Sequence, residues 1–309
     1  MRRAEFTATL ESMFPSWPDP EQTARLLPYP ALVDALRAAC LESARGEIRS
    51  PDRLALPLGG GGVMLSMPAS APDIASHKLV NVCPANRERG LPTIQGQVTA
   101  YDAATGAPLF ALDGPTVTAR RTAAVSVLGI QTLFGTPRNV LLIGTGKQAE
   151  AHAQAITAVF PEARIRVKGS RLESAKAFCE RVGGLLFPTD EVPEGAEVVI
   201  TATTSKAPIY ALPARPGRLV VAVGAFTPDA AEIAPHTVRA SRVYVDDPAG
   251  ARHEAGDLLQ AGVDWAGVHA LADALTTPPS AGEALLFKTV GCAAWDLAAC
   301  RVARERLGE

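Results

Sequence analysis

A glycine-rich segment in the second half of the chain has the pattern of a dinucleotide-binding turn. The apolar run Val140–Ile143 leads into the sequence GTGKQA, which has the form GxGxxA. The first glycine permits a tight turn, the second lets the backbone approach a pyrophosphate, and the small last residue lets the helix pack on the strand. The phosphates would then meet free N–H groups at the positive end of a helix. We therefore expect a dinucleotide to be bound here by Gly144, Thr145, Gly146, Gln148 and Ala149.

A chance glycine turn is the alternative interpretation of this segment. The preceding apolar strand, the following helical pattern and a second strand about 20 residues later all favour binding. The end of that second strand, Arg164–Arg171, contains no carboxylate. NAD enzymes usually place an acid there to bind the ribose hydroxyls, whereas Ser170 and Arg171 could bind a 2′-phosphate. The pattern favours NADP(H) and leaves NAD(H) as the alternative, with Arg171 then a solvated residue at a helix start.

Strand-like and helical segments alternate from residue 137 onward. Continuous apolar strands separated by helices predict a parallel sheet covered on both faces. A long helix is expected from Pro115, and a last helical stretch from about Ala281 to Arg306. The expected strands are NVLLIG, RIRVKGS, EVVITAT, RLVVAVG and RVYVD. Helix KQAEAHAQAITAVF is expected between the first two strands, and helix LESAKAFCERVG between the second and the third.

The first half has a different pattern. One helix is expected from Pro28 to Gly46, followed by short apolar segments between residues 53 and 112 that indicate an antiparallel sheet. The run Gly59–Gly62 lacks the Lys-Ser/Thr of a phosphate loop and is expected to be a hairpin tip. The fold class is therefore α/β, a Rossmann-type parallel-sheet domain plus an α+β domain, divided near residue 117.

Composition excludes several other classes. The chain has 309 residues and a formal net charge of −2, which gives no electrostatic case for nucleic acid or an anionic membrane. No segment approaches the roughly 20 apolar residues of a membrane span, and the N-terminus lacks the apolar core of a signal peptide. Five scattered cysteines and five histidines form no metal-binding spacing. We expect a cytoplasmic protein with no metal site.

Short segments spread along the chain occur in the order known from one family. The chain resembles the ornithine cyclodeaminase/mu-crystallin family across nearly its whole length. The matching segments are Pro51-Asp52-Arg53; Met67-Pro68; Lys78-Leu79-Val80-Asn81; Pro84 and Asn86; Gly90-Leu91-Pro92; 102–106; Asp113-Gly114; 118–124; 143–149; 202–205; Val223-Gly224-Ala225; and Leu286-Phe287-Lys288 with Gly291.

This resemblance implies an organisation and a set of site residues. It implies a substrate-binding and dimerisation domain over residues 1–117, a Rossmann domain over 118–287 and a C-terminal helix, 288–309, that packs back on the first domain. Homodimers would form through the sheet of the first domain. Thr203 and Val223 would join the cofactor site. Small amino or imino acids would be the substrates, and the matching cations Arg53, Lys78 and Arg121 would bind their carboxylate.

The residues alone leave these three roles open. Lys78 alternates with Ser76 and Val80 on one face of a strand, where a solvated lysine is the plainer interpretation. His77 would face the other side of that strand. Arg121 has Arg120 beside it, and Arg53 has Arg49 nearby, so residue type does not choose between neighbours.

One position separates two activities of the resembled family. Its cyclising deaminases carry an aspartate in the loop after Val-Gly, where this chain has Phe226, which can neither accept a proton nor bind an ammonium by hydrogen bonding. The favoured function is an NAD(P)H-dependent ketimine reductase that converts pyrroline-2-carboxylate or piperideine-2-carboxylate to proline or pipecolate. Ornithine cyclodeaminase, an alanine-type amino-acid dehydrogenase and a mu-crystallin-like NADPH-dependent binding protein are the alternatives.

Overall fold

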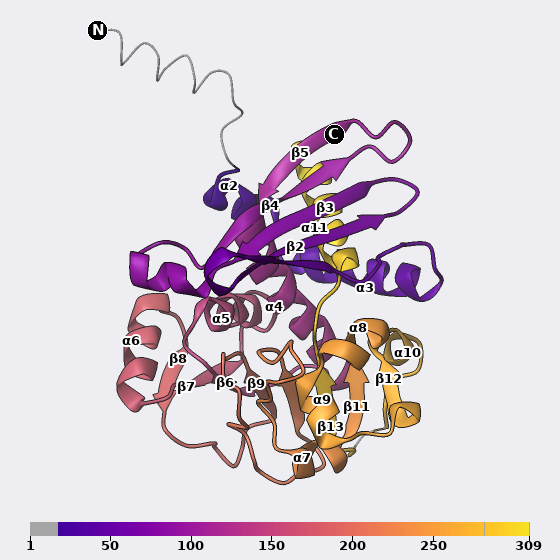
Figure 1. Ribbon diagram of the computed structural model, residues 1–309. Helices are drawn as coiled ribbons and strands as arrows, with labels where there is room; N and C mark the ends of the chain where they lie inside the picture. The colour runs from indigo at the N-terminus through magenta and orange to yellow at the C-terminus, as the bar shows by residue number, and fades with distance from the viewer. Residues whose placement is uncertain (1–17, 281, 309) are drawn as a thin grey trace, which may run out of the picture.

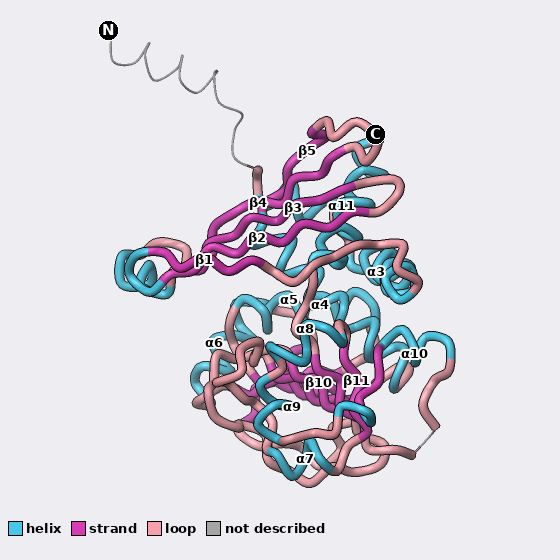
Figure 2. The backbone as a smooth tube through the Cα atoms, turned by 45° about the vertical axis from the view of Figure 1, so that its right-hand side comes forward, coloured by secondary structure: helices cyan, strands magenta, loops and turns pink. Residues whose placement is uncertain are grey.

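The structure is a computed structural model, and it describes residues 18–280 and 282–308. It contains two sheets, one above the other, with helices between them and on the outer face of the lower sheet (Figures 1 and 2). The expectation about a signal peptide concerns residues outside the described ranges. Within those ranges, no helix has both the length and the apolar composition that crossing a bilayer requires.

The upper sheet is an antiparallel meander, as the alternating segments predict. Its five strands lie in chain order, β1-β2-β3-β4-β5. Two helices, α2 and α3, precede the sheet, and the short helices η1 and η2 lie between strands. The bounds are α2 (Pro20–Leu26), α3 (Tyr29–Ala44), β1 (Leu54–Leu58), η1 (Gly59–Gly61), β2 (Gly62–Ser70), β3 (Ala75–Val82), η2 (Pro84–Arg89), β4 (Ile94–Tyr101) and β5 (Pro108–Asp113). The expected hairpin tip at Gly59–Gly62 is confirmed, with Gly60 and Gly61 at positive φ.

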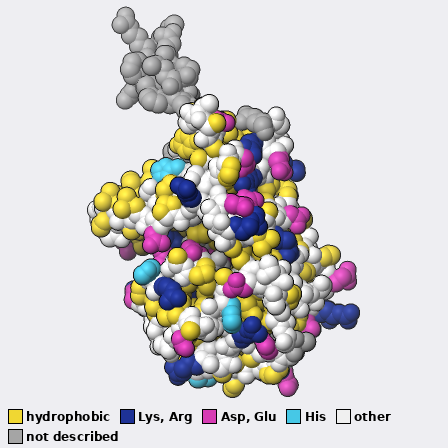
Figure 3. Space-filling model, turned by 90° about the vertical axis from the view of Figure 1, so that its right-hand side faces the viewer, with side chains coloured by type: hydrophobic (Ala, Val, Ile, Leu, Met, Phe, Trp, Pro, Cys, Tyr) yellow, Lys and Arg dark blue, Asp and Glu magenta, His cyan; other side chains and the backbone are white. Residues whose placement is uncertain are grey.

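One edge of the upper sheet leaves apolar side chains in water. Strand β1 pairs only with β2 among the described strands, and Leu54 and Leu56 are 66% and 55% exposed. Leu91 and Ile94, near the start of β4, are also exposed. Hydrophobic side chains gather on the lobe that projects from the upper half of the molecule (Figure 3).

The lower sheet is parallel throughout, and the expected α/β class is confirmed. Its order is β12-β11-β13-β10-β9-β6-β7-β8. The part β8-β7-β6-β9-β10 has the strand order of a Rossmann half, with the switch point between β6 and β9. The bounds are α4 (Gly114–Leu133), β6 (Asn139–Ile143), α5 (Lys147–Val159), β7 (Arg164–Lys168), α6 (Leu172–Val182), β8 (Leu186–Thr189), β9 (Val198–Thr201), β10 (Leu219–Ala222), α7 (Pro235–Arg239), β11 (Arg242–Val245), α8 (Pro248–Glu254), α9 (Gly256–Ala261), η3 (Trp265–Gly267), β12 (Val268–Ala270), α10 (Leu271–Thr276), β13 (Leu285–Lys288) and α11 (Ala293–Leu307).

The expected last helix from Ala281 to Arg306 is wrong in its first part. Residues Leu285–Lys288 form β13, inserted between β10 and β11, and α11 begins only at Ala293. The short apolar run fits a buried strand as well as a buried helix, so periodicity could not decide between them. Burial of the whole run between two parallel neighbours stabilises the strand.

Helices α4 and α11 join the two sheets. Helix α11 packs against the upper sheet and α3 (Figure 1). Arg301 and Arg304 hold it there through Asp73 at the β2–β3 turn, with N–O distances of 2.6 and 2.7 Å. The expected boundary between residues 117 and 118 lies inside the first turn of α4. One hydrophobic core runs through both sheets, so no linker separates the two parts.

Candidate functional site

The turn after β6 has the geometry that a pyrophosphate needs. Gly144 has φ +133°, and a Cβ there would lie 2.4 Å from the carbonyl oxygen of Ala202. Gly146 is the exposed N-cap of α5, and a Cβ there would meet no atom within 4 Å. Within the described chain, no side chain caps α5, and the buried Oε1 of Gln148 has no hydrogen-bond partner. The helix end is thus open and rich in unused polar groups, which fits a bound dinucleotide.

The floor beside this turn is organised by a buried glutamate. The Oε1 atom of Glu232 accepts hydrogen bonds from Thr203 N at 2.8 Å and Thr203 Oγ1 at 2.7 Å. Its Oε2 atom accepts from Gly224 N at 2.6 Å and Thr201 Oγ1 at 2.9 Å. Glu232 therefore fixes the carboxyl ends of β9 and β10, which carry Thr203 and the buried Val223. Both expected cofactor residues lie at this edge of the sheet.

A second buried carboxylate supports the first. Asp257 Oδ1 accepts hydrogen bonds from the backbone N–H groups of Glu232 at 2.6 Å and Ile233 at 2.9 Å. Its Oδ2 atom lies 3.0 Å from Lys288 Nζ, and both side chains are fully buried. Sequence reasoning used Lys288 only as a matching position and did not expect this network. Only Lys288 carried a local signal, as a charged residue at the end of a short apolar run, because Asp257 lies in α9 and Glu232 lies in the segment between β10 and α7.

Ser170 and Arg171 follow β7 and are exposed, with Arg171 as the N-cap residue of α6. The Ser174 hydroxyl donates a hydrogen bond to the backbone carbonyl of Arg171 at 2.7 Å and leaves the guanidinium unused by the cap. The side chain is therefore available to an anionic ligand at the edge where the ribose of a dinucleotide is expected.

Two of the three expected cations share one buried carboxylate. Lys78 Nζ lies 2.7 Å from Asp296 Oδ2, and Arg121 Nε lies 3.2 Å from Asp296 Oδ1. Ser76, Lys78 and Val80 are at most 4% exposed, so the interpretation of Lys78 as a solvated lysine is wrong. Helix α11, which carries Asp296, covers the face of β3 on which Lys78 lies. Sequence reasoning did not identify this aspartate.

The third cation, Arg53, contacts the chain segment that leads into α11. Arg53 Nη2 donates hydrogen bonds to the carbonyl oxygens of Gly291 at 2.7 Å and Val290 at 3.2 Å, and lies 2.8 Å from Glu254 Oε2. Gly291 has φ +76°, and a Cβ there would lie 2.3 Å from Arg121 Nη1. Arg53 and Arg121 therefore both lie against Gly291. Two carboxylates, Asp296 and Glu254, contact the three cations directly. A third buried carboxylate, Asp246, lies beside the cluster and accepts hydrogen bonds from Val290 N and Gly291 N at 2.9 Å.

The neighbouring basic residues have other contacts. Arg120 donates to the carbonyl oxygen of Leu27 at 2.8 Å and lies 4.0 Å above the ring of Tyr29. Arg49 is exposed and pairs through its backbone with Ser70. His77 faces the other side of β3, as expected, where its Nε2 lies 2.8 Å from Ser66 Oγ. The tertiary structure thus separates each expected site residue from its sequence neighbour.

Burial controls the charge of the central lysine. Removal from water lowers the pKa of Lys78 from its usual range to about 8, while Asp296 raises this pKa and Arg121 and Arg53 lower it. An ammonium with a pKa near 8 can hold or release a proton near neutral pH, as general acid–base chemistry requires.

The loop after β10 carries Phe226, which is 49% exposed. The nearby Asp229 does not take the place of an aspartate there, because its carboxylate lies 2.8 Å from Lys206 Nζ and accepts a hydrogen bond from Thr227 Oγ1 at 2.7 Å. These contacts, with the hydrogen bond from Lys206 the largest, hold the pKa of Asp229 at about 2. An acid with this pKa is a poor proton acceptor near neutral pH.

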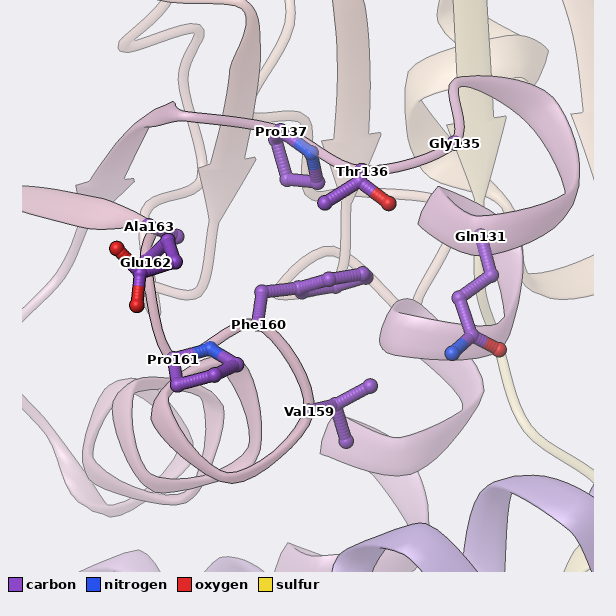
Figure 4. A pocket seen from close by; sticks show the side chains of 9 residues that line it. All are labelled: Gln131, Gly135, Thr136, Pro137, Val159, Phe160, Pro161, Glu162 and Ala163. Carbon is purple, nitrogen blue, oxygen red and sulfur yellow. The ribbon is translucent and has the colours of Figure 1, made fainter.

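A cavity of about 240 Å³ opens at the other end of the parallel sheet, near the last turns of α4 and α5. Phe160, Val159 and two prolines surround it, with Gln131 and Glu162 at its edges (Figure 4). It has no cation among its lining residues to bind an acid group, and we assign it no role. Among the described residues, no group of His, Cys, Asp and Glu side chains could hold a metal ion.

Replacing Glu232 should weaken dinucleotide binding. In Glu232→Gln, the amide NH₂ would face donors that now meet a carboxylate oxygen, and each unsatisfied buried group costs about 1–3 kcal/mol. We expect dinucleotide affinity, measured by fluorescence titration, to fall about tenfold or more. Glu197→Gln is the control, because Glu197 binds the backbone N–H groups of Arg138 and Asn139 at the opposite end of β6. An equal loss of affinity in both variants would contradict the placement of the cofactor.

Comparison with known proteins agrees with this geometry. The model of the ornithine cyclodeaminase/mu-crystallin family matches residues 21–309. The Delta(1)-pyrroline-2-carboxylate reductase 1 of Burkholderia multivorans is 62% identical over 294 residues, 94% of this chain and 95% of that protein. The Delta(1)-pyrroline-2-carboxylate/Delta(1)-piperideine-2-carboxylate reductase of Azospirillum brasilense is 62% identical, with the same shares.

A solved structure has the same fold. It is the Delta(1)-pyrroline-2-carboxylate reductase of Thermococcus litoralis in complex with NADH and L-proline. It is 27% identical to this chain, has a TM-score of 0.83, and the match covers 93% of this chain and 95% of that one. The glycine turn, the two sheets and the sequence relationship lead to one conclusion: the chain belongs to the ornithine cyclodeaminase/mu-crystallin family.

Proposed function

We propose that this protein is an NAD(P)H-dependent reductase of small cyclic imino acids, which converts pyrroline-2-carboxylate to proline and piperideine-2-carboxylate to pipecolate. The observation that carries the proposal is the convergence of three buried or half-buried cations, Arg53, Lys78 and Arg121, whose N–H groups can bind a substrate carboxylate. The names of the two relatives at 62% identity support the same activity.

The roles of the chain's own residues follow from this charge distribution. Arg53 and Arg121 would grip the carboxylate with their planar guanidiniums, and Lys78 would add a compact charge. Burial excludes water, strengthens these contacts and fixes the imine carbon in one position, so that positioning supplies much of the rate. A dinucleotide bound at Gly144–Ala149 supplies the hydride. Lys78 would hold a proton beside the ring that is reduced.

Ornithine cyclodeamination is less consistent with the loop after β10. Phe226 offers no proton acceptor, and the carboxylate of Asp229 is engaged by Lys206 and Thr227. An imine that is already formed needs no such acceptor. Reduction without deamination is therefore the better fit.

The proposal includes two domains and a cytoplasmic location. Residues 1–117 would bind the substrate, 118–287 would bind the dinucleotide, and α11 would complete the first domain from the C-terminal side. The contacts of α11 with the upper sheet support this division.

The activity is tested directly with both cofactors. NADPH or NADH absorbance should fall on addition of pyrroline-2-carboxylate or piperideine-2-carboxylate. Ammonia release from L-ornithine with catalytic NAD would instead support a cyclodeaminase, and NADH formation from L-alanine would support a dehydrogenase. Dinucleotide binding without any of these reactions would indicate a binding protein.

We propose that NADP(H) is the preferred cofactor, because Ser170 and Arg171 replace the acid of NAD enzymes. Arg171→Gln should raise the KM for NADPH roughly tenfold or more through loss of charge-assisted hydrogen bonds, and should leave the KM for NADH nearly unchanged. Initial rates with each cofactor measure this. Equal changes with both cofactors would contradict the role.

Lys78→Ala should reduce kcat/KM for the imine by at least about a hundredfold, because a buried charge that binds and orients the substrate is lost. Dinucleotide affinity should stay nearly intact, since Lys78 lies on the upper sheet. Steady-state kinetics and cofactor titration measure the two effects. An equal loss of both would contradict the placement of Lys78 in the substrate site.

Carboxylate binding should weaken as the pH rises through about 8. Burial lowers the pKa of Lys78 to about 8, so the ammonium is present below this pH and lost above it. The inhibition constant of tetrahydrofuran-2-carboxylate, which has no basic nitrogen, should rise above pH 8. The guanidinium of Lys78→Arg should remove this rise because it stays charged. A flat profile in the wild-type protein would be the contrary result.

We propose a homodimer that covers the exposed edge at β1. An unpaired edge strand with exposed leucines is normally covered by a partner. Leu56→Asp should convert the dimer to a monomer in light scattering. Leu185→Asp is the control, because Leu185 is 56% exposed and lies just before β8 of the other sheet. A monomeric wild-type protein, or dissociation by both variants, would contradict the proposed interface.

A further inference from the structure

Asp296 lies between Lys78 and Arg121, two of the cations that are proposed to bind the substrate. It lies in the first turn of α11, its side chain is fully buried, and its two oxygens point to different cations. Oδ2 lies 2.7 Å from Lys78 Nζ, and Oδ1 accepts a hydrogen bond from Arg121 Nε at 3.2 Å. One carboxylate thus joins β3 of the upper sheet to α4 between the sheets.

The contact with Arg121 leaves the fork of that guanidinium free for another ligand. Asp296 is bonded to Nε, on the side of the group, while Nη1 and Nη2 lie over Gly291. A bidentate grip on a carboxylate can use two N–H groups on parallel bonds. Asp296 therefore fixes the plane of the Arg121 guanidinium through Nε and engages neither Nη1 nor Nη2.

The charged groups around Lys78 make Asp296 the one source of compensation in the described structure. Arg121 from α4 and Arg53 from the segment before β1 both repel the ammonium, and Asp296 from α11 attracts it. Cys300, one turn further along α11, is a buried thiol whose pKa is raised, so it adds no negative charge near neutral pH. An uncompensated buried ammonium would lose its proton.

We infer that Asp296 is a positioning residue for the proposed reduction, which keeps the Lys78 side chain protonated and aligns Lys78 and Arg121 on the substrate carboxylate. The inference rests on the proposed function for its substrate, but its electrostatic part does not. Asp296 is expected to touch neither the substrate nor the cofactor.

The first test compares carboxylate binding in wild-type protein and Asp296→Asn across pH 6 to 10. The probe is tetrahydrofuran-2-carboxylate with the cofactor-loaded protein, and binding is measured by calorimetry. Loss of the attracting carboxylate should move the alkaline loss of binding from about pH 8 to lower pH by roughly one to three pH units. Asp73→Asn is the matched control, since Asp73 also binds α11 through two arginines but lies far from Lys78. It should leave the midpoint unchanged.

The second test needs no substrate. The pKa of Lys78 is about 8 in the fold and 10.5 in its ordinary range, so the cost of its charge is full below pH 8 and disappears as the pH rises toward 10.5. Without Asp296 this cost is larger at pH values below 8. The loss of stability in Asp296→Asn, measured by urea unfolding, should therefore be largest near pH 6 and shrink as the pH rises through 8. In Asp73→Asn the loss should be constant, because Asp73 stays ionised over this range.

The outcomes separate the inference from the proposed function. An unchanged midpoint together with a stability loss that is constant with pH would overturn the inference and leave Asp296 a packing residue. If Asp296→Asn does not fold, adding Lys78→Met should restore folding by removing the unpaired charge, and a double variant that also fails to fold would overturn the inference. Failure of the wild-type protein to reduce either imine would overturn the proposed function alone, since the urea measurement still decides the role of Asp296.

Discussion

The burial of positive charge is the constraint on which the rest of this structure depends. Arginine and lysine side chains can bind an acid group strongly only away from water, yet removing them from water is costly unless carboxylates compensate them. Asp296 and Glu254 contact the three cations directly, and in the proposed function a substrate carboxylate would bind to the donors that these contacts leave free. The same burial brings the pKa of Lys78 close to neutral pH.

The segment from β13 into α11 connects the two halves of the site. Lys288, at the end of β13, supports Asp257 and through it Glu232 on the dinucleotide side. Gly291 then contacts two of the substrate-side cations. Asp246, at the end of β11, fixes this turn by accepting hydrogen bonds from Val290 N and Gly291 N, each at 2.9 Å. Any shift of β13 would therefore disturb both the cofactor floor and the cation cluster.

The family supports several chemistries on this one frame, and local substitutions decide between them. In the proposed function, the cation cluster and the glycine turn would serve any reaction that joins a small acid to a dinucleotide. This chain differs from the cyclising deaminases in the loop after β10, where it has Phe226 in place of a proton acceptor. A hydrophobic side chain there suits a substrate whose imine needs no assembly, and this agrees with the names of the closely similar relatives.

The sequence by itself determined the glycine turn after β6, the parallel sheet with its first strands and the antiparallel meander, because each depends on local periodicity and on glycine geometry. The tertiary structure alone decided which basic residues meet. Lys78, Arg121 and Arg53 are distant in sequence, and their neighbours Arg120 and Arg49 have the same chemistry. Asp296, Glu232 and the strand Leu285–Lys288 also required it, because compensation of a buried charge and pairing between two strands depend on contacts that no local pattern encodes.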